Sequence, residues 1–248
     1  MRLLLVNSNT SAFVTDKVAS AARAVAQHTT EIVPVTGTFG ARVIATRTEL
    51  AIAEHATIEL LAEHAPGCDA VVIAVSYDVA LWAAREMLNI PIVGITEAAL
   101  LTACMLGGRV GVVVFGRRVL PLYQERVANY GLTSRIAGWR AIESSAPYAA
   151  GDQSEADALT VAAARDLVER DGAEVVVLTG AVMAGVPQRL QPSIDVPLLD
   201  GISCAVRQAE LLASTAPTKP RVGSLAPLPQ RELVNVSPSI AALFSSPT

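Results

Sequence analysis

The chain has 248 residues, of which 52% are hydrophobic and 17% are charged. Ordinary globular domains carry about 25% charged residues, so this composition excludes disorder over most of the length and fits one large domain or two small, closely joined ones. The formal net charge is −4, aromatic residues make up 4%, and no basic run is present, which argues against a nucleic-acid binder.

Cysteine usage and hydropathy indicate the cellular compartment. Cys68, Cys104 and Cys204 cannot all pair within one chain and form no CxxC motif, which is typical of a reducing cytoplasm. The apolar run near the start is too short for a signal peptide, and the apolar stretch at 175–187 is too short for a membrane span. We therefore expect a cytoplasmic protein without a membrane partner.

Short apolar runs alternate with longer helical patterns, which is typical of an α/β protein with buried parallel strands. In chain order, strands are predicted at residues 3–6, 31–36, 70–75, 92–95, 110–115, 135–142, 174–178 and 197–199. Helices are predicted between them at residues 11–27, 49–65, 79–88, 97–106, 120–130, 155–170 and 202–214. Pro34 cannot donate to a β-ladder, so the second strand is predicted at a sheet edge. Residues 215–248 are rich in Pro, Ser and Thr, which predicts an irregular tail that wraps the body or a neighbouring subunit.

The chain carries a weak internal repeat. VVIAVS at residues 71–76 precedes PIVGITEAAL, and VVVLTG at residues 175–180 precedes PLLDGISCAV. The repeat predicts two pseudo-symmetric α/β lobes with parallel sheets flanked by helices, the first from residues 1–100 and 197–214 and the second from residues 101–196. Ligands bind at the carboxyl ends of strands in open α/β sheets, so we expect Ser76 and Gly180 to face each other across a cleft between the lobes.

The first predicted strand ends in a polar turn, NSNTS, at residues 7–11. Asn9, Thr10 or Ser11 is needed to cap the helix that follows, and the turn could do no more than that. The alternative is that the turn offers side-chain and backbone donors to an anion or a carbonyl. Three consecutive hydroxyl or amide residues beside Asn7 favour the binding turn.

Ser76, Tyr77 and Asp78 form a second strand-to-helix turn. The glycines of a nucleophile elbow are absent and no histidine lies at a strand end, so a Ser-His-Asp triad is not predicted. Ser76 could simply donate a hydrogen bond while Asp78 caps the next helix. Glu97 and Asp200 stand at helix starts, where the helix dipole favours a carboxylate, or they orient a substrate and move a proton. No metal-ligand spacing and no glycine-rich nucleotide motif is present, so neither a metal nor a cofactor is expected.

Five blocks occur in a specific order along about the first 213 residues. They are LLLVNSNTS, DAVVIAVSYDVALWAAREMLNIPIVGITEAAL, GRVGVVVFGRRVLPLYQERVANYGL, EVVVLTGAVMAG and VPLLDGISCAV. Together they resemble the aspartate/glutamate/hydantoin racemase superfamily, and within it the hydantoin and allantoin racemase branch. The resemblance implies two pseudo-symmetric lobes with a cleft between them, no cofactor, and a homo-oligomer.

The resemblance also implies where the chemistry lies. In that family two cysteines, one per lobe, flank the substrate α-carbon, and one removes a proton while the other returns a proton from the opposite face. These positions fall at Ser76 and Gly180 here. A hydroxyl is a much weaker base than a thiol and glycine can move no proton, which implies non-cysteine chemistry centred on Ser76. Tyr77, Asp78 or Glu97 would assist it.

The substrate-binding positions that follow from the resemblance and from the two turns lie in both lobes. Thr179 could supply a hydroxyl from the second lobe beside Gly180. The full set of expected binding residues is Asn7, Asn9, Thr10, Ser11, Thr179, Gly180 and Ala181.

The sequence thus predicts a cofactor-independent isomerase of the racemase type that acts on a small hydantoin-like ring or amino-acid derivative. One alternative is a hydrolase or a decarboxylase (lyase) that acts on a cyclic amide or a carboxylate, with Ser76 at its centre. Another is a non-catalytic paralogue that binds such a ligand.

Overall fold

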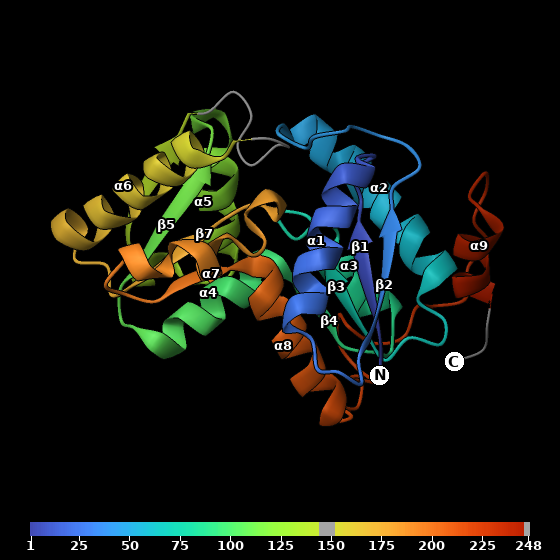
Figure 1. Cartoon of the computed structure of the whole chain (residues 1–248). Coiled ribbons are helices and arrows are strands. Elements are labelled where there is room, and N and C mark those ends of the chain that lie inside the picture. Colours follow the sequence, from blue (N-terminus) through green and yellow to red (C-terminus); the bar gives the residue numbers. More distant parts are fainter. Residues whose placement is uncertain (144–151, 246–248) are drawn as a thin grey trace.

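The computed structural model describes residues 1–143 and 152–245, which form two four-stranded parallel sheets flanked by helices (Figure 1). The first sheet has the order β2-β1-β3-β4, from β1 (Arg2–Asn7), β2 (Glu31–Thr36), β3 (Ala70–Ile73) and β4 (Ile92–Gly94). The second has the equivalent order β6-β5-β7-β8, from β5 (Val110–Phe115), β6 (Ile136–Ile142), β7 (Val175–Leu178) and β8 (Leu198–Asp200). The predicted α/β class is confirmed.

The strands are short apolar runs because helices cover both faces of each sheet. Leu3 to Val6 in β1 and Val175 to Leu178 in β7 are almost fully buried, so alternation with polar residues is absent. Strand β2 lies at the edge of the first sheet, where Pro34 aligns with Leu5 of β1. The predicted edge position of Pro34 is confirmed.

All seven predicted helices are present. They are α1 (Ala12–Val25), α2 (Arg47–His64), α3 (Leu81–Met87), α4 (Ile95–Leu106), α5 (Leu120–Asn129), α6 (Ser154–Asp171) and α8 (Gly201–Ser214). The structure adds short elements that a periodic pattern cannot indicate: η1 (Arg117–Val119), η2 (Thr133–Arg135), η3 (Ala181–Met183), α7 (Val186–Leu190) and η4 (Gln191–Ser193).

Helices α4 and α8 cross between the two lobes. Helix α4 follows β4 of the first sheet but packs against β7 of the second, while α8 follows β8 of the second sheet and packs against β3 and β4 of the first. The two helices also pack against each other, and a side chain at Gly201 would bring a Cβ within 2.6 Å of the Ile95 carbonyl oxygen. Residues 198–200, which we expected in the first lobe, pair with β7 and lie in the second sheet.

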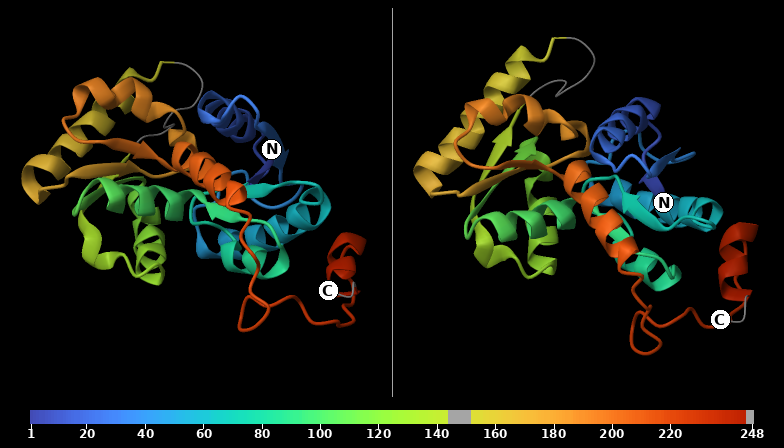
Figure 2. Two further views of the ribbon diagram at one scale, coloured as in Figure 1. Left: turned by 90° about the horizontal axis from the view of Figure 1, so that it is seen from below. Right: turned by 60° about the horizontal axis from the view of Figure 1, so that its bottom comes forward.

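The tail was expected to be irregular, and this prediction is wrong for α9 (Pro238–Ser245). Proline is tolerated in the first helical turn, and the Ser237 hydroxyl accepts a hydrogen bond from the Ile240 N–H at 3.2 Å. Buried Ile240 lies in this helix, which packs against α2 of the same chain. Figure 2 shows the preceding segment running from α8 past the first lobe to α9.

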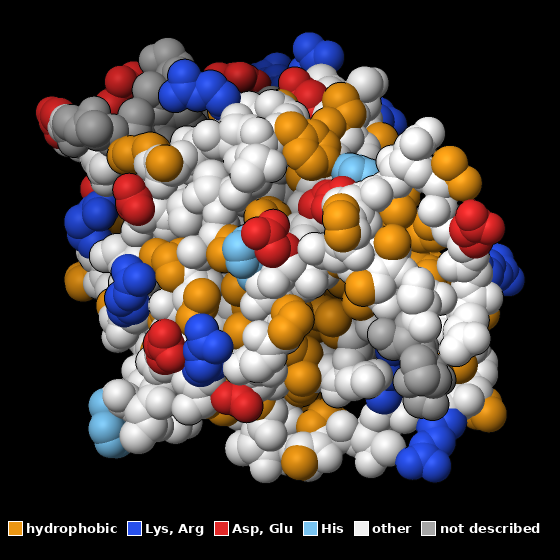
Figure 3. Space-filling model, turned by 90° about the vertical axis from the view of Figure 1, so that its right-hand side faces the viewer, with side chains coloured by type: hydrophobic (Ala, Val, Ile, Leu, Met, Phe, Trp, Pro, Cys, Tyr) orange, Lys and Arg blue, Asp and Glu red, His pale blue; other side chains and the backbone are white. Residues whose placement is uncertain are grey.

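Charges of both signs are interspersed on the face that carries α9 (Figure 3). This arrangement differs from the basic stripe of a nucleic-acid binder. Among the helices of residues 1–143 and 152–245, none combines the length and the apolar character that a membrane crossing requires.

Candidate active site

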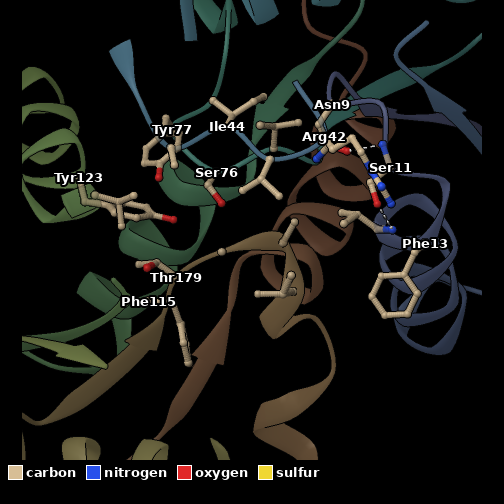
Figure 4. A pocket seen from close by; sticks show the side chains of 18 residues that line it. Asn9, Ser11, Phe13, Arg42, Ile44, Ser76, Tyr77, Phe115, Tyr123 and Thr179 are labelled. Atoms are coloured by element: carbon tan, nitrogen blue, oxygen red, sulfur yellow. Dashed lines mark hydrogen bonds between the residues drawn. The ribbon is translucent and has the colours of Figure 1, made fainter. Parts of the chain in front are cut away.

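A cavity of about 470 Å³ lies where the carboxyl ends of strands from both sheets meet. Its walls come from the turns after β1 and β3, the loop between β2 and α2, the start of α5, and the turn after β7. Figure 4 shows polar side chains from both lobes directed into this space. The predicted location of the ligand site, at strand ends between the lobes, thus coincides with a cavity.

Seven of the eleven residues expected at the site line this cavity: Asn9, Ser11, Ser76, Tyr77, Thr179, Gly180 and Ala181. Four others do not: Asn7, Thr10, Asp78 and Glu97.

Ser76 and Gly180 oppose each other, as the internal repeat predicted. A Cβ built on Gly180 would lie 3.9 Å from the Ser76 Oγ. The two strand ends therefore bring one hydroxyl and one bare backbone position to the same point in the cavity.

Gly180 adopts φ 104°, a conformation that residues with a side chain rarely adopt. Space is available, since the nearest atoms to an added Cβ are Val182 Cγ2 at 3.7 Å and the Ser76 Oγ. We expect Gly180→Ala to lower the free energy of unfolding by about 1 to 3 kcal/mol through backbone strain alone. Chemical denaturation would measure this, and an unchanged midpoint would show that the backbone relaxes to a negative φ.

The turn after β1 both caps a helix and lines the cavity. The Ser11 hydroxyl accepts from the Val14 N–H and caps α1, while the Asn9 Oδ1 accepts from the Ser11 N–H at 2.9 Å. Asn7 is fully buried, and its amide donates to Asn9 Oδ1 and to Thr15 Oγ1 at 3.0 and 2.9 Å. Asn7 therefore holds the turn from behind and leaves Asn9 and Ser11 to face the cavity.

The turn after β3 is conformationally strained. Tyr77, Asp78 and Ala80 have φ values of 73°, 49° and 56° without being glycine. Such residues persist only where their surroundings hold them, and they gather at functional sites. Here the Tyr77 ring packs on the Tyr123 ring at 4.7 Å between centroids.

Asp78 is fully buried. The sequence analysis considered that Asp78 caps the next helix, and the structure shows that it does not. Helix α3 begins after Ala80 without a side-chain cap. Instead, the Asp78 carboxylate accepts from the N–H groups of Thr96 and Glu97 at the start of α4, both at 2.8 Å, and from the Tyr130 hydroxyl at 2.5 Å. Burial raises the pKa of Asp78 to about 6, although these three hydrogen bonds oppose the shift.

Glu97 lies outside the cavity and pairs with a cation. Arg85 donates to Glu97 Oε1 at 3.1 Å and also contacts Oε2, and its guanidinium lies 5.0 Å from the Trp82 ring centroid. The second acidic candidate, Asp200, caps α8 by accepting from the Ser203 N–H at 2.9 Å. The structural interpretation of both carboxylates, as helix-start residues, accounts for their positions.

Tyr123, on α5, is a site residue that the sequence analysis missed. Burial raises its pKa to about 12, and hydrogen bonding with the hydroxyls of Ser76, Thr179 and Tyr77 opposes that shift. The Thr179 hydroxyl donates to the Val113 carbonyl at 2.9 Å. Three hydroxyls, those of Ser76, Tyr77 and Thr179, therefore surround the Tyr123 oxygen from both lobes.

The lining also includes Arg42, which the sequence analysis did not consider, but no Cys, His, Asp, Glu or Lys from the described residues. The three thiols lie elsewhere: Cys68 before β3, Cys104 in α4 and Cys204 in α8. Within residues 1–143 and 152–245, no group of three or more acidic, His or Cys side chains could hold a metal ion. The polar chemistry that the cavity offers is thus that of hydroxyls, one amide and one guanidinium.

Comparisons with known proteins agree with this architecture. The sequence profile described as Asp/Glu/hydantoin racemase matches residues 3–209. A hydantoin racemase from Paenarthrobacter aurescens is 32% identical over 216 residues, which is 86% of this chain and 92% of that protein.

Two solved structures extend the likeness to three dimensions. An allantoin racemase from Klebsiella pneumoniae superposes with a TM-score of 0.89 at 31% identity, covering 97% of this chain and 98% of that one. An allantoin racemase from Pseudomonas fluorescens superposes with a TM-score of 0.83 at 32% identity, covering 94% and 100%. Profile, relatives and fold together show that this chain belongs to the Asp/Glu/hydantoin racemase family.

Proposed function

We propose that the chain is an isomerase that exchanges the proton on the stereogenic carbon of a small hydantoin-like ring. The single observation that carries this proposal is the opposed placement of Ser76 and Gly180 in a cavity formed by both lobes. The names of the relatives support the substrate class, since they are hydantoin and allantoin racemases. None of these relatives is named a hydrolase or a lyase, so those alternatives gain no support from them.

The proton carriers in this proposal are hydroxyls. Ser76 would face the ring carbon from the first lobe, where its hydroxyl takes the ring proton while passing its own proton to ionised Tyr123. Thr179 would supply the hydroxyl on the opposite side, because Gly180 has no side chain. A carbon between a carbonyl and an amide nitrogen loses its proton more readily than an ordinary carbon, and a general base contributes about 10² to 10⁴-fold to such a step.

A second candidate function is ligand binding without turnover. It is favoured by one observation, that no lining residue among the described ones carries a thiol, carboxylate or imidazole. Burial raises the pKa of the Tyr77 and Tyr123 hydroxyls, so both stay protonated at neutral pH and offer almost no basic form. The cavity would then hold the ring without exchanging its proton.

Deuterium exchange separates these functions. Each enantiomer of several 5-substituted hydantoins is incubated with the protein in D₂O, and NMR and chiral chromatography follow the label and the configuration. For the isomerase, deuterium appears at the ring carbon faster than without protein and the configuration inverts. Thermal stabilisation by the ligand without exchange would instead establish the binding protein.

Exchange with retention of configuration would contradict the isomerase. It would mean that only the Ser76 side of the cavity transfers a proton. A family member in which the same panel shows inversion provides the positive control.

A further inference from the structure

Among the described residues that line the cavity, Arg42 is the one charged side chain. The remaining polar groups are neutral hydroxyls and an amide. In Figure 4, Arg42 and Ser11 lie at one end of the cavity and Tyr123 lies at the other, with Ser76 between them. The cavity thus has a cationic end and a hydroxyl end.

Hydrogen bonds on both sides of Arg42 hold the loop that carries it. The Ala41 carbonyl accepts from the Thr10 N–H at 3.1 Å, and the Ala45 N–H donates to Glu49 Oε2 at 2.8 Å. Ile44 is buried in the core of the first lobe. The backbone at residue 42 is therefore fixed at the cavity wall.

Arg42 is an exposed arginine without a counter-ion among the described residues. Arg47 pairs with Glu125 and Arg85 pairs with Glu97, whereas no ion pair among residues 1–143 and 152–245 involves Arg42. A guanidinium that faces a cavity without a carboxylate partner is available to a bound anion.

The N-terminus of helix α1 adds a second positive electrostatic contribution at the Arg42 end of the cavity. Helix α1 begins directly after Ser11, runs for 14 residues, and has no acidic residue in its first turn. The positive end of its dipole therefore adds to the field of Arg42. The hydroxyl end has no comparable charge among its lining residues.

From this arrangement we infer that the substrate is an anion, a hydantoin-like ring whose 5-substituent ends in a carboxylate. The carboxylate binds Arg42, which places the ring carbon between Ser76 and Gly180. Arg42 is thereby a specificity-determining residue. This inference rests on the proposed function and narrows its substrate class from neutral rings to acidic ones.

The test compares two ligands that differ in charge but hardly in shape, hydantoin-5-acetic acid and hydantoin-5-acetamide. Isothermal titration calorimetry measures their dissociation constants for the wild type and for Arg42→Gln. We expect the wild type to bind the acid about tenfold more tightly than the amide, and Arg42→Gln to abolish that preference while leaving the affinity for the amide unchanged. Added salt is expected to weaken the binding of the acid but not the binding of the amide.

Arg118→Gln is the matched control. Arg118 is an exposed arginine on η1, outside the residues that line the cavity, and its substitution removes the same charge. We expect this variant to keep the preference for the acid. An equal loss in Arg118→Gln would show that net charge, not the contact with Arg42, selects the ligand, and would overturn the inference.

The remaining outcomes separate the inference from the proposed function. Equal affinities of the wild type for the two ligands, with deuterium exchange intact, would overturn the anionic substrate and leave the isomerase standing. Tight binding of the acid that depends on Arg42, without exchange, would support the anionic site and overturn the isomerase. If neither ligand binds, the anionic-substrate inference fails and the exchange panel alone decides the isomerase.

Discussion

Replacement of Tyr123 by Phe is expected to slow deuterium exchange at the ring carbon by about 10²-fold, and Ser76→Ala by a similar factor. Tyr123 is buried, and its hydroxyl interacts with those of Ser76 and Thr179. Removing either oxygen breaks the path by which a proton could leave the substrate. Exchange rates from NMR, measured at saturating ligand, would check both values.

The double variant Ser76→Ala/Tyr123→Phe is expected to lose little more than either single variant, because groups that act as a unit are not additive. Tyr130→Phe is the control, since Tyr130 donates to Asp78 and does not line the cavity. We expect it to lower the unfolding midpoint while exchange stays close to the wild-type rate. Full exchange in Tyr123→Phe would remove Tyr123 from the mechanism.

The pH profile gives an independent check. Burial raises the pKa of Tyr123 to about 12, so its ionised fraction rises about tenfold per pH unit below that value. If ionised Tyr123 assists proton removal, the rate keeps rising across neutral and mildly alkaline pH. A plateau near pH 8 would require a different base, because no Cys, His or Lys among the described residues lines the cavity.

Much of the fold follows from the sequence because buried parallel strands are short, continuous runs of Leu and Val. Pro34 even indicates which strand lies at the edge. Helix α9 could not be predicted in this way, since its one proline and two serines resemble the composition of the irregular tail around it. Its position depends on packing against α2, which lies far away in the sequence.

Some site residues were likewise predictable from the sequence and others were not. Ser76, Thr179 and Gly180 were predictable because strand ends must meet at one edge of a sheet. Tyr123 and Arg42 could not be predicted, because Tyr123 lies inside a helix and Arg42 lies in a loop, and neither position carries a sequence motif that indicates a cavity. Their contribution depends on how the two lobes pack.

The roles of the two acidic residues near the site were equally dependent on distant partners. Glu97 pairs with Arg85, 12 residues earlier, and Asp78 accepts from Tyr130, 52 residues later. Neither partner can be read from the local sequence. A carboxylate at a strand end can therefore act in catalysis or stabilise the fold, and its hydrogen-bond and ion-pair partners decide which.

Asp78→Ala is expected to lower the free energy of unfolding by about 3 to 5 kcal/mol, the largest loss among the substitutions considered. The variant would leave the N–H groups of Thr96 and Glu97 and the Tyr130 hydroxyl without their acceptor. These donors belong to α4 and to the end of α5, so one carboxylate joins the strained turn after β3 to two helices. Urea denaturation would measure the loss.

Asp78→Asn isolates the effect of the charge. Burial raises the pKa of Asp78 from 3.8 to about 6, so the folded protein holds the proton more tightly than the unfolded chain. The resulting stabilisation is present below pH 3.8 and is lost as the pH rises through 6. The stability of the wild type relative to Asp78→Asn is therefore expected to fall by about 2 kcal/mol between about pH 4.5 and about pH 7.5.

The comparison with Asp78→Asn removes the contributions of every other titrating group. Asp200, for example, also has a pKa raised by burial, but it is present in both proteins. A relative stability that rises with pH would mean that the three donors outweigh burial and hold the pKa of Asp78 below its ordinary value. The strained turn that presents Ser76 would then be held by an ionised carboxylate throughout the neutral range.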